Sequence, residues 1–506
     1  MGFLLMIFLF YSACASSPPQ SDICRVALEG SPTTLDPRYD TGAYATRIFP
    51  LIYTYLFEMD STGQVIPLAA ESMEQPDPLT YIVRLKKGIR FHDGAELTSK
   101  DVASTFRFIK DPANGSPSAD GLDMLENVIE RDPWTVILQL SKPFASFPLK
   151  LAKAICPAHR MGKDELAAKP LGAGPYKVTE YRRGEKLTLE AFDDYFGGKP
   201  QIRKIIFQII SNETTRMLKL KRGDIDLVLN GIPPYSLDFF QKDPQKKVIR
   251  KPGINFSYLG FNLQDPKRIT SNILVRKAVA HAIDRDAIIK ILISGQARKA
   301  NGLLAPENWA YATGLTVYEY DPVKSKRLLD EAGFPNPPGN APRFVLSYKT
   351  STDKLRNRIA EVIAKQLQEV GIKVEKRSFE WGTFFDDIKK GNFQTYTLSW
   401  VGVMDPDALR YIYHSSSQPP RGANRGRYIN PQVDALLDAA RAEMDLNKRK
   451  ELYAQVQKII AEDCVVVPLW WADDIVVTQK RLEGFDLVPG GLYTSLSRAK
   501  IISHKN

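Results

Sequence analysis

Cysteine and histidine are scarce in this chain, which holds 4 cysteines and 5 histidines among 506 residues. No Cys-x-x-Cys or His-Glu-x-x-His spacing occurs, so neither a redox motif nor a zinc site is indicated. The Gly-x-Ser-x-Gly motif of serine hydrolases and the Walker motif of nucleotide-binding loops are also missing. The sequence therefore gives no catalytic residue, no metal ligand and no cofactor to predict.

Long apolar runs are missing as well. After Phe10 no stretch of about eighteen apolar residues follows, which excludes a protein with several membrane-spanning helices. The composition, 43% hydrophobic and 25% charged, is that of an ordinary folded protein. A chain of 506 residues is too long for one hydrophobic core, so we expect two or three packed units.

The net charge of +11 raises the question of a nucleic-acid partner. The basic blocks, such as residues 219–222 and 376–377, are short and interleaved with acidic residues. No zinc spacing and no DNA- or RNA-binding motif accompanies them. We expect no nucleic-acid partner, and assign the charge to a solvated surface or to one that faces an anionic membrane.

The first twenty residues have the pattern of an export signal. Residues 1–10 form an apolar run that is too short to cross a bilayer but has the length of a signal-peptide core. Small residues then lead to Cys14, as in a bacterial lipobox, where the cysteine is diacylated and becomes the mature N-terminus. The Ser- and Pro-rich residues 15–21 read as a flexible tether. We expect a lipid-anchored protein of the periplasm or cell envelope; the alternative is a plain signal peptide cut nearby, with Cys14 lost.

The remaining cysteines bear on the oxidation state. If Cys14 carries lipid, then Cys24, Cys156 and Cys464 can form at most one disulfide. The sequence does not select the pair.

Strand-like and helix-like segments alternate along the chain, which indicates an α/β fold. Residues 134–140, 203–210 and 465–471 have the residue types of strands, and Pro468 predicts an edge or a bulge in the third. Thr98 and Asp101 predict a helix start, as does Asp321 followed by Pro322. Between residues 354 and 370 the apolar positions lie on one helical face, closed by Gly371 and followed by a strand.

Two short stretches that contain proline and glycine, residues 169–175 and 251–253, predict boundaries between lobes. Because free linkers are few, we expect any movement of the lobes to occur about short hinges. Trp381 and Trp400 lie next to glycines, Gly382 and Gly402, where a ring and the backbone can approach a ligand. Packing in the core is the alternative reading of both tryptophans.

Blocks along nearly the whole chain resemble one known family. The sequence is similar to the large extracellular solute-binding proteins of ABC importers, of the oligopeptide- and dipeptide-binding type. The similar blocks are residues 35–37, 63–72, 81–94, 98–102, 172–176, 194–200, 223–226, 261–262, 275–285, 326–333 and 428–437. Within this pattern His92 looks like a structural turn residue.

The resemblance implies a periplasmic-binding-protein type II-like, two-lobed α/β fold with an additional inserted domain. The expected organisation is a signal, lipobox and tether over 1–21; lobe I over 22–50, 170–254 and 478–506; inserted domain II over 51–169; and lobe III over 255–477.

The implied function is that of a monomeric substrate-binding lipoprotein, not an enzyme. It would bind short peptides in a cleft between lobes I and III and deliver them to an ABC permease and ATPase complex. One alternative is the same transport role for a sugar, a metal chelate or an opine-like compound. Others are an exported hydrolase on a similar scaffold and a receptor or chaperone-like lipoprotein without a transport role.

The resemblance also suggests ligand-binding residues. In the peptide binders, the loop after the tryptophan that matches Trp400 carries an aspartate for the peptide amine, and Val403 stands there in this chain. A valine cannot neutralise an ammonium group, and Asp405 could replace the aspartate only if the loop shifted. The amine is therefore held elsewhere, or the ligand has no free amine. The expected ligand-binding residues are Thr41, Gly42, Ala43 and Tyr44 in lobe I, with Trp381, Trp400, Gly402, Val403, Met404 and Asp405 in lobe III.

Overall fold

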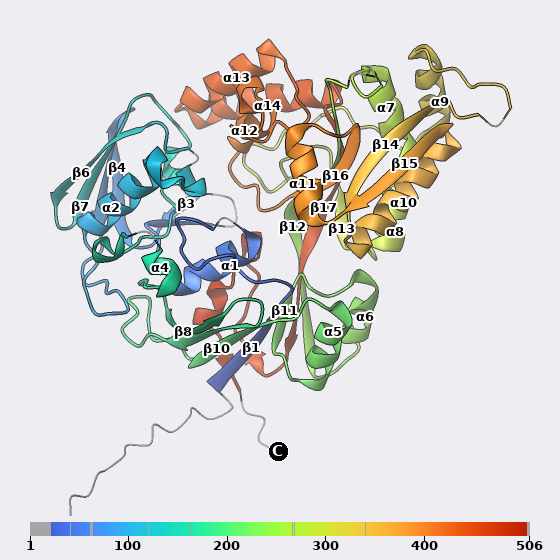
Figure 1. The fold of residues 1–506 in the computed structure, drawn as a ribbon. Coiled ribbons are helices and arrows are strands. Elements are labelled where there is room, and N and C mark those ends of the chain that lie inside the picture. Colours follow the sequence, from blue (N-terminus) through green and yellow to red (C-terminus); the bar gives the residue numbers. More distant parts are fainter. Residues whose placement is uncertain are drawn as a thin grey trace, which may run out of the picture.

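The computed structural model describes residues 22–40, 42–60, 64–119, 121–162, 164–265, 267, 269–339 and 341–502. Within these ranges, an 11-stranded mixed sheet extends from β8 to β15 (Figure 1). Its strands in spatial order are β15 (Ile372–Phe379), β14 (Phe344–Ser351), β16 (Thr395–Trp400), β12 (Lys246–Phe261), β17 (Val466–Gln479), β11 (Leu227–Leu229), β1 (Ile23–Leu28), β10 (Lys204–Ile209), β9 (Lys186–Ala191) and β8 (Tyr176–Arg182), while β13 (Ala297–Lys299) pairs with β17. Parallel pairs occur around β1 and β14, and the other pairs are antiparallel. The predicted α/β class is confirmed.

A separate antiparallel sheet lies at the left of Figure 1. It has the order β4 (Ala70–Asp77), β5 (Thr80–Leu85), β7 (Thr135–Leu140) and β6 (Leu125–Asp132), and α2 (Ser99–Lys110) packs against it. The predicted strand over 134–140 is thus the inner strand β7. Thr98 begins α2 as predicted, because its backbone N–H donates to Asp101 Oδ2 at 2.8 Å in a capping box.

The long strands β12 and β17 join the two halves of the large sheet. The predicted boundary at residues 251–253 falls inside β12, where the register with β17 shifts between Lys251 and Asn255. At Gly253 an added Cβ would lie 2.1 Å from the carbonyl oxygen of Ala472 on β17, so only glycine permits this approach. The two paired strands therefore approach each other closely near Gly253, where we expect a hinge. Pro468 lies at a second register shift, which makes it a bulge in an inner strand and not an edge.

Helices cover the sheets. They are α1 (Ala43–Ile52), α3 (Phe147–Lys150), α4 (Glu165–Ala168), α5 (Glu213–Arg222), α6 (Leu237–Gln241), α7 (Ile273–Ala282), α8 (Arg285–Leu292), α9 (Pro322–Glu331), α10 (Lys354–Glu369), α11 (Trp381–Lys390), α12 (Ala408–Tyr413), α13 (Pro431–Ala442) and α14 (Leu446–Glu462). Asp321 caps α9 and accepts the backbone N–H of Lys324 at 2.8 Å. The predicted apolar face of α10 is buried through Ile359, Ile363 and Leu367.

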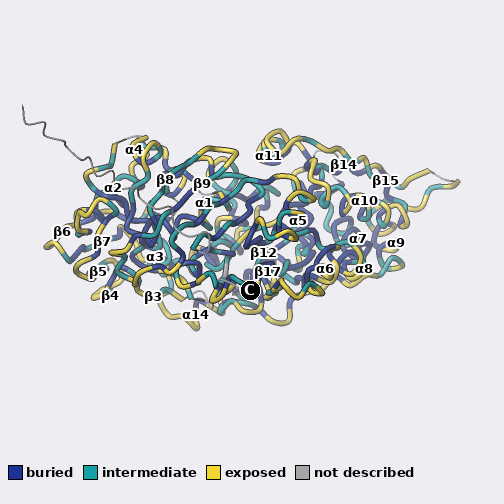
Figure 2. Tube along the Cα trace, turned by 90° about the horizontal axis from the view of Figure 1, so that it is seen from below, coloured by how far each residue is buried: buried dark blue, intermediate teal, exposed yellow. Residues whose placement is uncertain are grey.

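Buried apolar side chains form separate clusters, seen as dark segments inside the elongated trace of Figure 2. One cluster combines residues from 24–53, 154–229 and 476–499, a second draws on 56–173, and two more draw on 256–471. The first cluster joins segments that are far apart in the sequence. We keep the predicted division into lobe I, inserted domain II and lobe III as a proposal, which this grouping supports.

The cysteines inside the described ranges do not pair. Cys24, Cys156 and Cys464 are buried and free. Burial raises the pKa of each thiol, so none carries a reactive thiolate at neutral pH. The described part of the chain has no helix that is both long and apolar enough to cross a membrane.

Candidate functional site

The predicted lobe I residues lie at the start of α1. Gly42 is the N-cap of this helix, and its N–H donates to Asp40 Oδ1 at 2.7 Å. Ala43 is exposed beside it, while Thr41 lies outside the described residues. The Tyr44 hydroxyl donates to Glu29 Oε2 at 3.2 Å, and burial together with this carboxylate raises the pKa of Tyr44 to about 12. The helix start therefore presents small residues and a protonated tyrosine hydroxyl.

The predicted lobe III loop follows β16 and is held by two asparagines. Gly402 has φ +66°, a conformation that favours glycine, and its N–H donates to Asn255 Oδ1 at 3.0 Å. Asn308 Nδ2 donates to the carbonyl oxygen of Met404 at 2.7 Å. Val403 is partly buried and packs against the adjacent hydrophobic cluster. This position of the loop therefore carries an apolar side chain.

Asp405 makes contacts with the inserted domain. Its Oδ1 accepts the Ser146 hydroxyl at 3.0 Å, and its Oδ2 lies 3.3 Å from Lys150 Nζ. These partners lie 259 and 255 residues away in the sequence, beside and in α3. In the structure the Asp405 carboxylate is thus engaged with Ser146 and Lys150, and its contact with a ligand stays a prediction.

A buried carboxylate lies below this contact. Asp407 is 7% exposed, and its Oδ1 has no hydrogen-bond partner in the structure. Burial, together with the neighbouring Asp405 carboxylate, raises the pKa of Asp407 to about 6, although Arg441 opposes the rise from 3.8 Å away. Arg441 also crosses to the inserted domain: its guanidinium lies 4.3 Å from the centre of the Phe144 ring. Residues 405, 407 and 441 therefore form one polar contact between the inserted domain and lobe III.

The predicted tryptophans belong to a larger group of rings and guanidinium groups, which we call the lobe III ladder. Trp381, 47% exposed, stacks on Phe385 with ring centres 5.5 Å apart and an interplanar angle of 11°. Arg356 lies 5.2 Å from the Trp381 ring. Arg425 lies 5.2 Å from the Phe385 ring and 4.4 Å from the Trp400 ring. The order through space is Arg356, Trp381, Phe385, Arg425, Trp400.

Sequence reasoning found the two tryptophans of the ladder and missed its other members. Phe385 follows Trp381 by four residues, so the helical spacing could have indicated their contact. Nothing local connects Arg356 or Arg425 to the tryptophans, because they come from α10 and from a loop after α12.

A small pocket lies beside Arg425. Its lining includes Tyr258, Tyr396, Trp400, Asn424 and Arg425. Its volume of 20 Å³ leaves room for about one or two water-sized groups. The described residues form no group of three or more His, Cys, Asp or Glu side chains placed to hold a metal ion.

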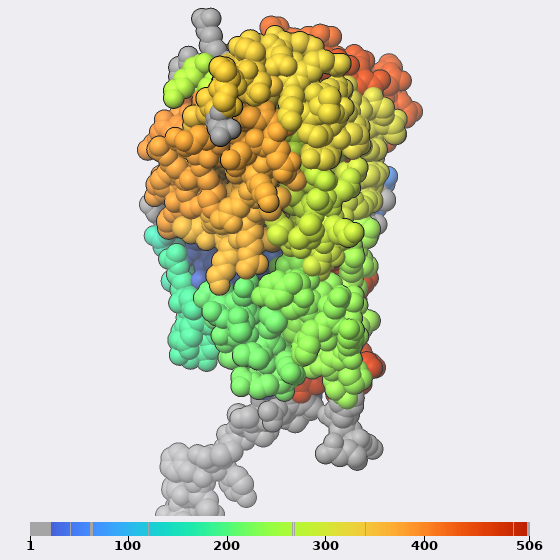
Figure 3. Space-filling model, turned by 90° about the vertical axis from the view of Figure 1, so that its right-hand side faces the viewer, coloured from blue at the N-terminus to red at the C-terminus, as the bar shows by residue number. Residues whose placement is uncertain are grey.

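The space-filling view shows a hollow between segments that are far apart in the sequence. In Figure 3, N-terminal residues coloured blue appear at its back, with orange residues above and green residues below. Among the described residues, no hydrogen bond or ion pair joins Gly42, Ala43 or Tyr44 to the loop at 402–405. The predicted lobe I and lobe III residues are therefore two groups without a direct polar contact, and a shared cleft stays a prediction.

Two lobes joined by the paired long strands β12 and β17, with an extra domain, define a binding-protein fold of the periplasmic type. Comparison with protein families gives the particular group. The family model described as "Bacterial extracellular solute-binding proteins, family 5 Middle" matches residues 64–421, so the chain belongs to this family. The predicted resemblance and the predicted two-lobed fold are confirmed.

Individual relatives cover almost the entire chain. The oligopeptide-binding protein AppA of Bacillus subtilis is 28% identical and covers 97% of this chain and 96% of its own length. The structure of AppA in complex with a nonapeptide has a TM-score of 0.84, with 27% identity and coverage of 95% and 99%. The dipeptide-binding protein of Escherichia coli is 29% identical, with 92% of each chain covered. AgaA from A. tumefaciens R10, in complex with agropinic acid, has a TM-score of 0.82, with 28% identity and coverage of 95% and 99%.

Proposed function

We propose that this protein is the substrate-binding component of an ABC importer and that it binds short peptides without changing any bond in them. The observation that carries the proposal is the similarity to AppA over nearly the full length of both chains, in sequence and in structure. The E. coli relative is also a peptide binder by name. A permease and ATPase complex would receive the bound peptide.

The proposed binding site is a cleft between lobes I and III. Thr41, Gly42, Ala43 and Tyr44 would line one side, and Trp381 and Trp400 with residues 402–405 would line the other. In this site the Asp405 carboxylate keeps its contact with Lys150 and supports the loop, whereas the neighbouring Gly402 and Val403 lie next to the ligand. Clefts between domains are common sites for small ligands.

Binding would shift the protein from an open to a closed arrangement of the lobes. The crossing of β12 and β17 near Gly253 supplies a short hinge. A ligand that contacts both lobes favours the closed state, and a shift from 1:99 to 99:1 needs about 5.5 kcal/mol of preference. The contacts of Asp405 with Ser146 and Lys150 add a ligand-independent link between the inserted domain and lobe III.

We also propose that the mature protein is a monomeric lipoprotein of the periplasm or cell envelope, with diacylated Cys14 as its N-terminus. The basis is the lipobox-like sequence, since Cys14 lies outside the described residues. Labelled palmitate should be incorporated by the natural protein and not by Cys14→Ser. Equal labelling of both proteins, or of neither, would refute the anchor.

A second candidate function is the transport of a non-peptide acid. The structure of AgaA with agropinic acid favours it, because this chain is as similar to AgaA as to AppA. The presence of Val403 in place of an amine-binding aspartate agrees with a ligand that has no free amine.

Native mass spectrometry of the purified protein separates these candidates, because a closed cleft retains ligand from the cell. A set of short-peptide masses, released intact on denaturation, supports peptide transport. One defined non-peptide mass supports the second candidate. A protein that remains empty and binds no member of a tripeptide library contradicts the peptide proposal.

A further inference from the structure

Arg425 lies in an unusual electrostatic position within the lobe III ladder. Its guanidinium lies against two aromatic faces, Trp400 at 4.4 Å and Phe385 at 5.2 Å. Nη1 donates to the Tyr258 hydroxyl at 3.2 Å. No carboxylate within the described part of the chain lies within ion-pair distance of this guanidinium. By contrast, Arg250 and Arg298 each pair with a carboxylate, and Arg276 donates to backbone carbonyl oxygens.

Geometry leaves Arg425 able to bind a further group. A guanidinium has five N–H donors, and the single hydrogen bond to Tyr258 uses one of them. Its other N–H groups have no acceptor among the described residues, so they can donate to a further group. Arg425 also lines the small pocket, together with Trp400 and Tyr258. A carboxylate is the acceptor that a guanidinium binds most strongly, because its two oxygens accept two parallel N–H groups.

A second cation lies at the other end of the ladder. Arg356 Nη1 is buried and has no hydrogen-bond partner among the described residues, and burial lowers the pKa of this guanidinium. Its ring contact is Trp381, which stacks on Phe385. The ladder therefore holds two positive charges and three aromatic rings.

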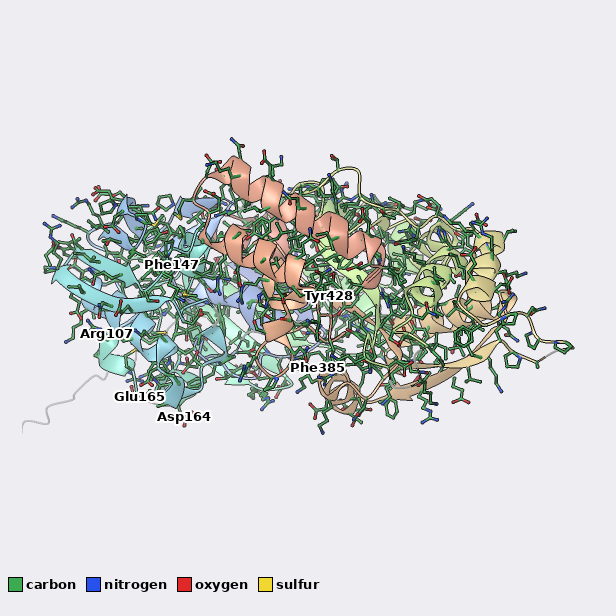
Figure 4. All side chains as sticks on the ribbon, turned by 90° about the horizontal axis from the view of Figure 1, so that it is seen from above. Arg107, Phe147, Asp164, Glu165, Phe385 and Tyr428 are labelled. Carbon is green, nitrogen blue, oxygen red and sulfur yellow. The ribbon has the colours of Figure 1, made fainter. Side chains whose placement is uncertain are left out.

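The neighbouring loop has no free negative charge to oppose an anion. Val403 is apolar, and Asp405 is held by Lys150 and Ser146. Phe385, which is labelled in Figure 4, lies near the middle of the molecule's long axis, between the parts formed by the early and the later chain.

We propose that Arg425 is the anchor for a carboxylate group of the bound solute, held against Trp400. This inference rests on the proposed function and adds to it the chemical class of the ligand. The protein selects solutes by an acid group, which for a peptide is its free C-terminus. Recognition of an amine by the loop at 402–405 is not required.

The test compares a tripeptide library that has free C-terminal carboxylates with the same library amidated at the C-terminus. Affinities are measured by tryptophan fluorescence and calorimetry on the full mature protein, on Arg425→Gln, and on Arg421→Gln as a matched control. Arg421 lies on the same loop and is exposed. Circular dichroism and urea unfolding show whether each variant is folded.

We expect amidation to weaken binding to the natural protein by about 10- to 100-fold, the usual effect of losing a charge-assisted hydrogen bond. Arg425→Gln should weaken the binding of the free acids by a similar factor and leave the amides unchanged, because the two changes remove the same interaction. Arg421→Gln should bind both libraries as the natural protein does.

Equal binding of acids and amides by the natural protein overturns the inference and leaves peptide transport intact. This comparison needs no variant, so it decides the matter even if Arg425→Gln does not fold. Equal weakening of acids and amides by Arg425→Gln also overturns it, since Arg425 would then only support packing. If the natural protein binds neither library, the proposal of peptide transport fails. Agropinic acid is then the test ligand for the carboxylate anchor. Binding of agropinic acid that is weakened by Arg425→Gln and not by Arg421→Gln would uphold the anchor, and failure of the natural protein to bind agropinic acid would overturn the anchor as well.

Discussion

Replacement of Asp407 by asparagine tests the electrostatics of the contact between the inserted domain and lobe III. Asp407 is 7% exposed, and burial together with Asp405 raises its pKa from 3.8 to about 6. One pKa unit corresponds to about 1.4 kcal/mol, so keeping this carboxylate ionised in the folded protein costs about 3 kcal/mol at pH 7. Asparagine has nearly the same shape and carries no charge.

Proton binding by Asp407 decides whether its contribution to stability rises or falls with pH. The pKa of Asp407 is higher in the folded than in the unfolded protein, so the folded state binds the proton more tightly. The contribution of this residue to stability is most favourable below pH 3.8 and is lost as the pH rises through about 6. Asp407→Asn should therefore raise the free energy of unfolding by up to about 3 kcal/mol at pH 7.5, and change it little at pH 4.

Urea unfolding without ligand, followed by tryptophan fluorescence at pH 4, 5, 6 and 7.5, measures this difference. Asp224→Asn is the control, because Asp224 is half exposed and pairs with an exposed arginine; its curves should match those of the natural protein. The reasoning is wrong if Asp407→Asn differs from the natural protein by the same amount at every pH, or destabilises it more at pH 7.5 than at pH 4.

Two further changes test other parts of the structure. Lys150→Met removes the ion pair with Asp405, which joins the inserted domain to lobe III. We expect the equilibrium of the unliganded protein to shift about fivefold toward the open state, or ~1 kcal/mol, which gives a larger radius of gyration. An unchanged radius of gyration would refute the link. Gly172→Ala places a Cβ 2.1 Å from the carbonyl oxygen of Ile52 at the end of α1. The backbone must move, so we expect a loss of more than about 3 kcal/mol in urea unfolding; a stability equal to that of the natural protein would contradict the close approach.

Local signals in the sequence predicted the local parts of the fold. Asp321 before Pro322 predicted the start of α9, and Asp321 caps that helix. Gly371 ends α10 with φ +90°, and β15 begins at the next residue. These features depend on hydrogen bonds and backbone angles within a few residues, so the sequence alone carries them.

Features that depend on tertiary packing were not predicted. The contact of Asp405 with Ser146 joins residues 259 positions apart, and no spacing rule indicates it. Arg425 meets Trp400 only because a loop after α12 folds back over the end of β16. The cysteines are a related case: Cys24 and Cys464 lie in different hydrophobic clusters, which the count of cysteines could not show.

For the predicted site residues, too, the sequence indicated some of the neighbours that the structure shows and missed others. The resemblance to solute-binding proteins placed Trp381 and Trp400, and the structure brings both into one ladder with Phe385. It also gave Asp405 as a ligand residue, and in the structure this carboxylate lies 3.3 Å from Lys150 Nζ. Contact of these residues with a ligand stays a prediction.

Small-angle X-ray scattering of the mature protein, titrated with the free-acid tripeptide library and followed by mass spectrometry of the recovered peptides, tests the central claim most directly. We predict a smaller radius of gyration at saturation and peptides that are recovered with unchanged masses. A scattering curve that is identical at every peptide concentration, or peptides that return cleaved or modified, would contradict a protein that closes around its solute and releases it intact.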